Sequence, residues 1–572
     1  MKRNKINIHY IIILGVSILL LLFLIRTPLI STHDATVHIL RIIGVDHTIN
    51  IGQFPPIISP YYGSNFGYAI NLFYGSLVTY GPLIIKLFTL TYVNALKIFT
   101  FITIFLSGFF MYKFTNQVTS NKNIALISSI LYIVAPYKLS NIYIRFAIGE
   151  FTALMFVPLV FLGLYNLFNQ DAKKHYYISI GAIGLILTHT ISAVYTAIFC
   201  FIYVLFNIKK LREIKIIKLC IINIIFILLV TAFFTVPILE HMSEGEYTIF
   251  NDIMFGEAET RVIEIQQYFV DKVDSYGSKL CFRIGILTII LLIIGIFVYK
   301  KIDNKYLNFY TIFCLLIVLT IFMTTKLFPW SLMPSIIYSI QFPWRLVGFL
   351  VFFTSFVCGV NMYLFTQAIC KTDKMKLIIY IIVITLIILY TIYIIMTCIS
   401  YNTETGKKYI EDYKYEQNIL ENPSINYYQI NRDYLPLSAI EDKDYWTNRE
   451  DKTLIIEGNA NIENENKNLT NLTLQMTNVE KDTIIELPYM FYLNYEVKLR
   501  VDDQEQILEK FSSDKGFVAV KLPQFDQGTI NFRYRPTNLM ILSYIISALS
   551  IIMFIIYIRR TNINEKQTIR EK

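Results

Sequence analysis

Long uninterrupted apolar runs, repeated along nearly the whole chain, are the feature that most constrains its fold. Each run is close to the roughly 20 residues that a helix needs to cross the hydrocarbon core of a bilayer. The chain of 572 residues is 55% hydrophobic and 16% charged, whereas soluble domains carry about 25% charged residues. The sequence therefore predicts a mainly α-helical integral membrane protein and excludes an ordinary soluble domain.

Twelve segments are predicted to span the membrane. They are residues 8–25, 97–114, 123–137, 150–168, 176–188, 190–207, 216–236, 283–299, 306–324, 346–368, 377–398 and 538–558. The first segment follows Lys2, Arg3 and Lys5, as the apolar core of a signal peptide does, but no small-residue cleavage site comes after it. We therefore expect it to remain in the protein as a signal anchor.

A further run at 66–90 is interrupted by Gly67, Gly75, Gly81 and Pro82. We predict that it forms an interfacial or re-entrant element on the outer surface and does not span. With this choice every basic cluster falls on one side of the membrane, which the positive-inside rule makes the cytoplasmic side. The clusters are the N-terminus, Lys113 with Lys122, Lys173 with Lys174, residues 209–218, 300–305 and 371–376, and the tail from Arg559.

The same topology divides the chain into parts. A membrane domain, 1–398, carries two long outer loops at 26–96 and 237–282, and it is followed by an extracytoplasmic region at 399–537. A final membrane helix at 538–558 and a cytoplasmic tail at 559–572 complete the chain. The formal net charge of +9 belongs mostly to the short cytoplasmic loops, so it indicates topology and no nucleic-acid partner.

The extracytoplasmic region changes character. Its first part, 400–450, is rich in Tyr and Asn and is expected to form an irregular or partly helical connector over the membrane domain. From 452 to 537 apolar and polar residues alternate, as in 453–457 and 516–522, and turn residues such as Asp502-Asp503 separate the runs. Alternation with period two predicts an antiparallel β-domain, large enough for a small sandwich.

Polar residues gather at the outer ends of the predicted helices. Five groups fall at one membrane level on that side, and they contain His33, Asp34 and His38; Arg145 and Glu150; His189; His241; and Arg345. Carboxylates with nearby His and Arg can remove a proton from a hydroxyl, hold a divalent cation or bind a phosphate. These are the needs of an enzyme that acts on an anionic lipid.

The order of these features resembles the GT-C class of membrane glycosyltransferases. His33-Asp34-Ala35-Thr36-Val37-His38, Gly52-Gln53-Phe54-Pro55, Gly149-Glu150 and the stretch from Leu487-Pro488-Tyr489 to Tyr534-Arg535-Pro536 look like the bacterial YfhO-like proteins. Related chains carry the label "6-pyruvoyl-tetrahydropterin synthase-related membrane protein". No His triad with metal-ligand spacing lies in a polar region of this sequence, so the label indicates no pterin chemistry.

The resemblance implies transfer of a sugar from a polyprenyl-phosphate sugar to a glycan or lipid acceptor at the outer surface of a bacterial cytoplasmic membrane. It implies catalytic roles for Asp34, as general base, and for Glu150. His33, His38, Arg145, His189, His241 and Arg345 are the candidate substrate-binding residues. No Asp-x-Asp motif stands in either of the first two outer loops, so a divalent cation is possible as a cofactor but not implied.

Simpler roles stay open for the same residues. Asp34 is also a favoured N-cap for a helix that begins at Ala35, and Glu150 suits the N-terminal end of a helix dipole. Arg345 beside Trp344 is also typical of an anchor at the membrane interface. Two other functions remain as alternatives: a transporter or flippase for lipid-linked saccharides, and a non-catalytic envelope assembly protein that binds through its β-domain.

Overall fold

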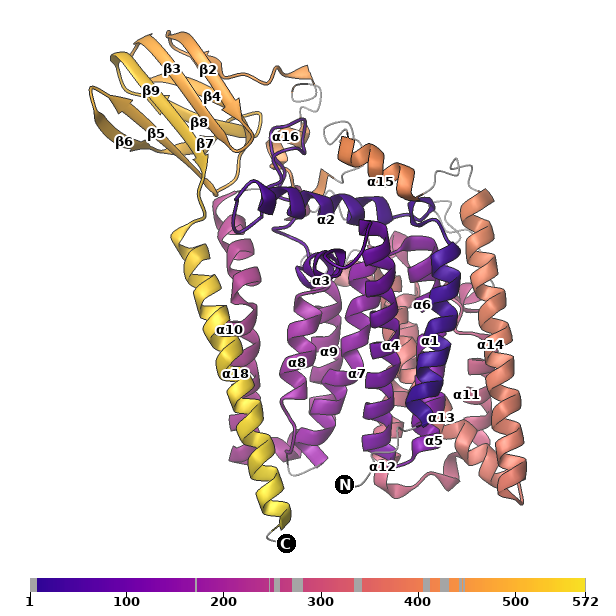
Figure 1. Cartoon of the computed structure of the whole chain (residues 1–572). Coiled ribbons are helices and arrows are strands. Elements are labelled where there is room, and N and C mark those ends of the chain that lie inside the picture. The colour runs from indigo at the N-terminus through magenta and orange to yellow at the C-terminus, as the bar shows by residue number, and fades with distance from the viewer. Residues whose placement is uncertain are drawn as a thin grey trace.

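A helical bundle with a β region mounted on one end makes up the molecule (Figure 1). The computed structural model describes residues 8–169, 172–245, 247–250, 258–269, 281–333, 342–404, 412–421, 432–441, 445 and 448–570. The basic N-terminal residues, parts of the predicted outer stretches 237–282 and 399–537, and the last two residues of the predicted tail lie outside these ranges.

The helices follow the apolar runs, because in lipid a helix satisfies all of its backbone polar groups internally. They are α1 Ile8–Arg26, α2 Ala35–Asn50, α3 Leu77–Lys86, α4 Tyr92–Thr119, α5 Lys122–Ile133, α6 Pro136–Ser140, α7 Ile148–Asn169, α8 Tyr177–Ile186, α9 Thr190–Phe206, α10 Ile214–Glu244, α11 Ile286–Val298, α12 Asn304–Thr324, α13 Val347–Ile369, α14 Asp373–Glu404, α15 Asp412–Glu421, α16 Leu437–Glu441 and α18 Asn538–Arg570.

Within the described residues, nine helical segments are long and apolar enough to cross a membrane, and each coincides with a predicted span. The three other predicted spans are also helical but shorter: α8 has 10 residues, α9 has 17 and α11 has 13. The predicted fold class, a polytopic helical membrane protein, is confirmed. Helix α3, at the doubtful run 66–90, has 10 residues and lies beside α2 at the end of the bundle that carries the β region (Figure 1).

Three segments form the centre of the bundle. The apolar stretches in 122–145, 148–169 and 343–369 are each 94% buried, whereas those of α1, α10, α14 and α18 are 22–28% buried and face outward. Helices α10 and α18 pair along one flank (Figure 1). Because these three segments are packed on all sides, polar side chains at their ends are held in fixed positions.

The β region is a pair of antiparallel sheets, as the alternating sequence predicts. One sheet has the strand order β1-β4-β8-β7 and the other β2-β3-β9-β5-β6. The strands are β1 Leu454–Glu457, β2 Asn461–Asn468, β3 Asn471–Val479, β4 Thr483–Met490, β5 Tyr495–Val501, β6 Gln504–Leu508, β7 Lys510–Ser512, β8 Phe517–Leu522 and β9 Phe525–Tyr534. Burial alternates along β3, which turns Leu472, Leu474 and Met476 inward.

The two ends of the bundle differ. The end that carries α2, α3, α15 and the β region, called here the β face, lies opposite the start of α1 and the end of α18 (Figure 1). Basic loops meet at the other end, called here the basic face: Lys305 Nζ donates to Ser120 Oγ at 2.6 Å, and Lys210 Nζ to the Phe168 carbonyl at 2.6 Å. Within the described residues, the basic loops that predicted the topology thus lie on a single face (Figure 1).

Candidate functional site

A broken helix at the β face presents the first polar side chains of the site. Helix α5 ends at Ile133, and Pro136 begins α6 because proline lacks the N–H that would continue α5 but suits the first helical turn. A π-helical turn, Asn141–Arg145, follows α6, and such turns occur frequently at functional sites. Phe146, in the left-handed conformation at φ 54°, ends it before α7 starts.

Glu150, in the first turn of α7, is the centre of a buried polar cluster. The residue is 3% exposed. Its Oε2 accepts a hydrogen bond from the Arg145 guanidinium at 2.8 Å, and its Oε1 accepts from Asn141 Nδ2 at 2.9 Å and from the Tyr137 hydroxyl. Both carboxylate oxygens are therefore satisfied by neighbouring side chains.

A second guanidinium approaches the same carboxylate. Arg345 Nε lies 3.8 Å from Glu150 Oε2, and its guanidinium carbon lies 4.8 Å from the centre of the Phe342 ring. Arg145 in turn stacks at 4.6 Å over Trp344. One carboxylate thus faces two buried guanidiniums that aromatic rings hold in place.

Backbone hydrogen bonds hold Asp34 next to this cluster. The N–H groups of His33 and Asp34 donate to the carbonyls of Ile144 and Arg145 at 3.1 and 2.8 Å, and the Asp34 and Arg145 side chains interact electrostatically. Asp34 stands at the N-cap of α2, but its side chain makes no cap hydrogen bond. The half-buried carboxylate is therefore not used to cap the helix, whereas the His33 side chain is exposed.

His38 lies one turn into α2 and is buried. Arg41 donates to its Nδ1 at 3.0 Å, which places the ring proton on Nε2, because arginine is always a donor. Burial, followed by the charges of Arg41 and Arg145, holds the His38 pKa well below its usual 6.5. His38 is therefore a neutral donor whose Nε2 has no hydrogen-bond partner in the described structure.

His189 has a structural contact of its own. It is the N-cap of α9, and its Nδ1 accepts the Ser192 N–H at 3.2 Å. It also interacts electrostatically with Arg345, Glu150 and Arg145, and burial, with the charge of Arg345 next, lowers its pKa to about 3. His189 therefore borders the cluster as a neutral ring.

His241 lies in different surroundings from the other candidates. It is fully buried in α10, where its Nδ1 donates to the Pro237 carbonyl at 2.8 Å. Its ring packs near Phe73 and Tyr247, with centroids 6.3 and 6.0 Å away. Among the contacts of the described residues, none joins His241 to Glu150 or Asp34, so the structure does not bring it into the cluster.

Several members of the cluster are absent from the sequence-based set. Tyr137 and Asn141 stand eight and four residues before Arg145, so their spacing on one helical face was a signal for them. Tyr74 has no such signal. It lies in an irregular loop, and its ring covers the Arg41 guanidinium at 3.7 Å while its hydroxyl lies beside Gly149.

The surroundings of Glu150 do not suit a divalent cation. A cation needs free carboxylate oxygens, but those of Glu150 face two guanidiniums, an amide N–H and a phenol O–H. Within the ranges that the structure describes, no group of three or more His, Cys, Asp or Glu side chains is placed to hold a metal.

Comparison with known proteins finds a similar chain of no assigned function and no matching family model. No family model matches the chain. An uncharacterized protein of Lactococcus lactis subsp. cremoris is 29% identical over 335 residues, which are 56% of this chain and 54% of the relative. The chain thus spans about half the length of the relative that it matches. The chain is a multi-pass membrane protein that is similar to this Lactococcus protein over half its length.

Proposed function

We propose that the chain is a GT-C-type glycosyltransferase that moves a sugar from a polyprenyl-phosphate sugar to a glycan or lipid acceptor. One observation carries the proposal. At the β face, two buried guanidiniums share the Glu150 carboxylate, beside a second carboxylate, Asp34, that does not cap its helix.

The paired arginines suit a phosphate. Three guanidiniums, those of Arg41, Arg145 and Arg345, lie around the two carboxylates of Asp34 and Glu150, so the cluster keeps a positive charge in a place of low dielectric. Guanidiniums bind phosphate oxygens strongly and directionally. In the proposed reaction they stabilise the charge that develops on the departing polyprenyl phosphate.

Asp34 is suited to activate the acceptor hydroxyl. It takes the proton of the acceptor hydroxyl, whose oxygen then forms a bond to the anomeric carbon of the donor sugar. The bond from that carbon to the phosphate oxygen breaks, and the phosphate keeps the electron pair. Glu150 is fully hydrogen-bonded, so we assign it the positioning of Arg145 and Arg345 in place of a direct catalytic role.

The proposal includes an orientation. The basic face, which contains Lys210 and Lys305, is assigned to the cytoplasm by the positive-inside rule. The β face, with residues 399–537, is then extracytoplasmic, and both termini are cytoplasmic in the bacterial membrane. Donor and acceptor would meet at the outer leaflet.

One observation favours a second candidate, a carrier of lipid-linked saccharides. Lys138 is buried in α6, and its ammonium donates to the hydroxyl of Ser107, near the middle of α4, at 2.5 Å. In the part of the chain that is described, no carboxylate pairs with it. Ionisable residues inside a bundle are typical of substrate and ion pathways.

Mass spectrometry of polyprenyl-phosphate sugars and envelope glycans tests the proposal. Matched cells express the wild-type protein, Asp34→Asn, Lys138→Met or no protein, at equal abundance. The transferase proposal expects Asp34→Asn to match the null strain, with a missing sugar linkage and accumulated donor, while Lys138→Met keeps the linkage.

The opposite result for the two variants would reject the transferase proposal. If Asp34→Asn retains the wild-type glycan profile and Lys138→Met loses it, the carrier becomes the better assignment. Asp373→Asn serves as the matched control, because that carboxylate is 98% exposed at the start of α14 on the basic face.

A further inference from the structure

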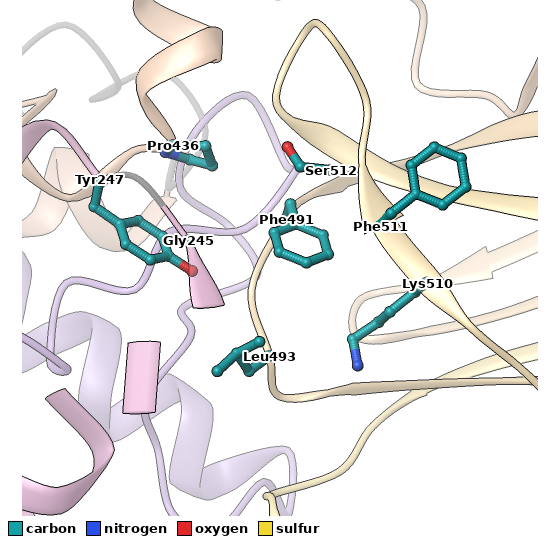
Figure 2. A pocket seen from close by; sticks show the side chains of 8 residues that line it. All are labelled: Gly245, Tyr247, Pro436, Phe491, Leu493, Lys510, Phe511 and Ser512. Carbon is teal, nitrogen blue, oxygen red and sulfur yellow. The ribbon is translucent and has the colours of Figure 1, made fainter. Parts of the chain in front are cut away.

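A cavity lies between the membrane bundle and the β region. It has a volume of about 370 Å³ and is lined by Gly245, Tyr247, Pro436, Phe491, Leu493, Lys510, Phe511 and Ser512 (Figure 2). The lining comes from the end of α10, the connector before α16, the turn after β4, and β7. Its size is at the lower end of the range for small-molecule pockets, about 300–1,000 Å³.

The hydroxyl of Tyr247 is the first sign that this cavity holds a ligand. Tyr247 is 2% exposed, and its hydroxyl has no hydrogen-bond partner among the described residues. In Figure 2 this hydroxyl points toward the side chains of Phe491 and Leu493. A buried hydroxyl without a partner is unfavourable, so a group that accepts or donates a hydrogen bond here would stabilise the protein.

The ring that carries this hydroxyl is held firmly. Tyr247 stacks on Tyr492 with centroids 5.8 Å apart and planes 5° from parallel. Its backbone pairs with Pro436, and the next residue, Thr248, donates its N–H to the Leu435 carbonyl at 3.1 Å. The hydroxyl is therefore prearranged and cannot turn away to find another partner.

The charges around the cavity argue against a phosphate. Lys510 is the one cation in its lining, and Lys510 interacts electrostatically with two carboxylates, Glu240 and Glu496. An anion would meet these carboxylates as well as the lysine. A purely apolar ligand would leave the Tyr247 hydroxyl without a partner.

A neutral sugar carries no negative charge that the carboxylates would repel, and it has hydroxyls that can pair with the Tyr247 hydroxyl. The C–H faces of a pyranose pack on the rings of Phe491 and Phe511, and its hydroxyls pair with the phenol of Tyr247 and the ammonium of Lys510. We propose that this cavity is a saccharide-binding site that holds a neutral sugar unit of the acceptor. Its assignment to the acceptor rests on the proposed function, but the binding of a sugar does not.

One layer of aromatic side chains separates the cavity from the cluster around Glu150. The ring of Phe73 lies 5.2 Å from Tyr247 and 5.5 Å from Tyr434. The next residue along the chain, Tyr74, covers Arg41 and lies beside Gly149. A glycan held at the cavity would therefore be close to the proposed site of transfer.

The test measures sugar binding by the full-length protein in detergent micelles. An array of neutral oligosaccharides finds the probe that binds best, and isothermal titration calorimetry gives its Kd. Tyr247→Phe, which removes one hydroxyl and keeps the ring, is expected to weaken binding about tenfold. Phe511→Ala, at a side chain that is already 40% exposed, is expected to weaken it by at least as much.

Two controls separate this proposal from the function above. Ile507→Ala, at a 66% exposed side chain on β6, and Asp373→Asn, at a 98% exposed carboxylate, are expected to bind the probe within twofold of wild type. If the wild-type protein binds no oligosaccharide on the array, or if Tyr247→Phe and Phe511→Ala bind as well as wild type, the saccharide site is rejected. If the cavity variants lose binding and Asp34→Asn leaves the cellular glycans unchanged, the saccharide site stands and the transferase fails.

Discussion

The N–H of Asp34 donates a hydrogen bond to the carbonyl of Arg145 at 2.8 Å. This bond joins the start of α2 to the end of the π-helical turn, and it uses only backbone atoms. The two side chains are thereby held near each other while the Asp34 carboxylate keeps no cap hydrogen bond. Substitution of the Asp34 side chain should therefore change catalysis and leave the stability of the fold unchanged.

Asp34→Asn is expected to leave the thermal unfolding midpoint in detergent unchanged and to reduce sugar transfer by a factor of about 100 or more, the size of a general-base contribution. The comparison is Thr91→Ala, because the Thr91 hydroxyl does cap α4 through the Asn94 N–H at 3.1 Å. Loss of that cap should cost about 1 kcal/mol of stability. A lower midpoint for Asp34→Asn than for Thr91→Ala would contradict the assignment.

Glu150→Gln should destabilise the protein strongly. It leaves Arg145 and Arg345 buried without their shared carboxylate, and breaking a buried ion pair costs about 3–5 kcal/mol. The double variant Glu150→Gln, Arg345→Met should be less destabilised than the sum of its two single changes. Thermal midpoints of the four proteins measure this coupling, and the exposed pair Asp373–Lys376 provides a control that should have no effect.

Gly149→Ala should disturb the site through Tyr74. A Cβ at this position would lie 2.5 Å from the Tyr74 hydroxyl and 3.1 Å from the Thr188 carbonyl oxygen. Overpacking of this kind costs about 1–3 kcal/mol. Tyr74→Phe added to Gly149→Ala should restore part of the midpoint, because it removes the atom that is nearest.

The control for this prediction is Gly15→Ala, where an added Cβ meets nothing within 4 Å. Its midpoint should be equal to that of wild type or slightly higher, since alanine favours a helix. An equal loss of stability in both variants would show that Tyr74 is not the cause.

His38 should make the protein less stable in acid. Burial first, and then Arg41 and Arg145, hold its folded pKa well below the usual 6.5, so the unfolded chain binds the proton more readily. The contribution of His38 is complete above pH 6.5 and is lost as the pH falls toward its folded pKa. His38→Gln, which can still accept from Arg41, should reduce the fall in thermal midpoint between pH 7 and 5. An unchanged pH profile would contradict a buried neutral His38.

The membrane architecture and the β region could be predicted from local sequence alone. Apolar runs of spanning length gave each of the nine long helices, and alternation at 453–457 and 516–522 gave β1 and β8. Both signals are local, because a helix in lipid and a half-buried strand each bury a face that is set by their own residues. The predicted helix lengths were less accurate, since α8 and α11 are three and four residues shorter than their predicted spans.

Only the tertiary structure decided which polar residues meet. The sequence marked Asp34, Glu150 and His241 at one membrane level, but packing joins Asp34 to Arg145 and leaves His241 among Phe73 and Tyr247. It also showed that Glu150 is fully hydrogen-bonded and that Asp34 does not cap its helix. These contacts join residues far apart in the chain, and they depend on how helices from different segments pack, which no local pattern encodes.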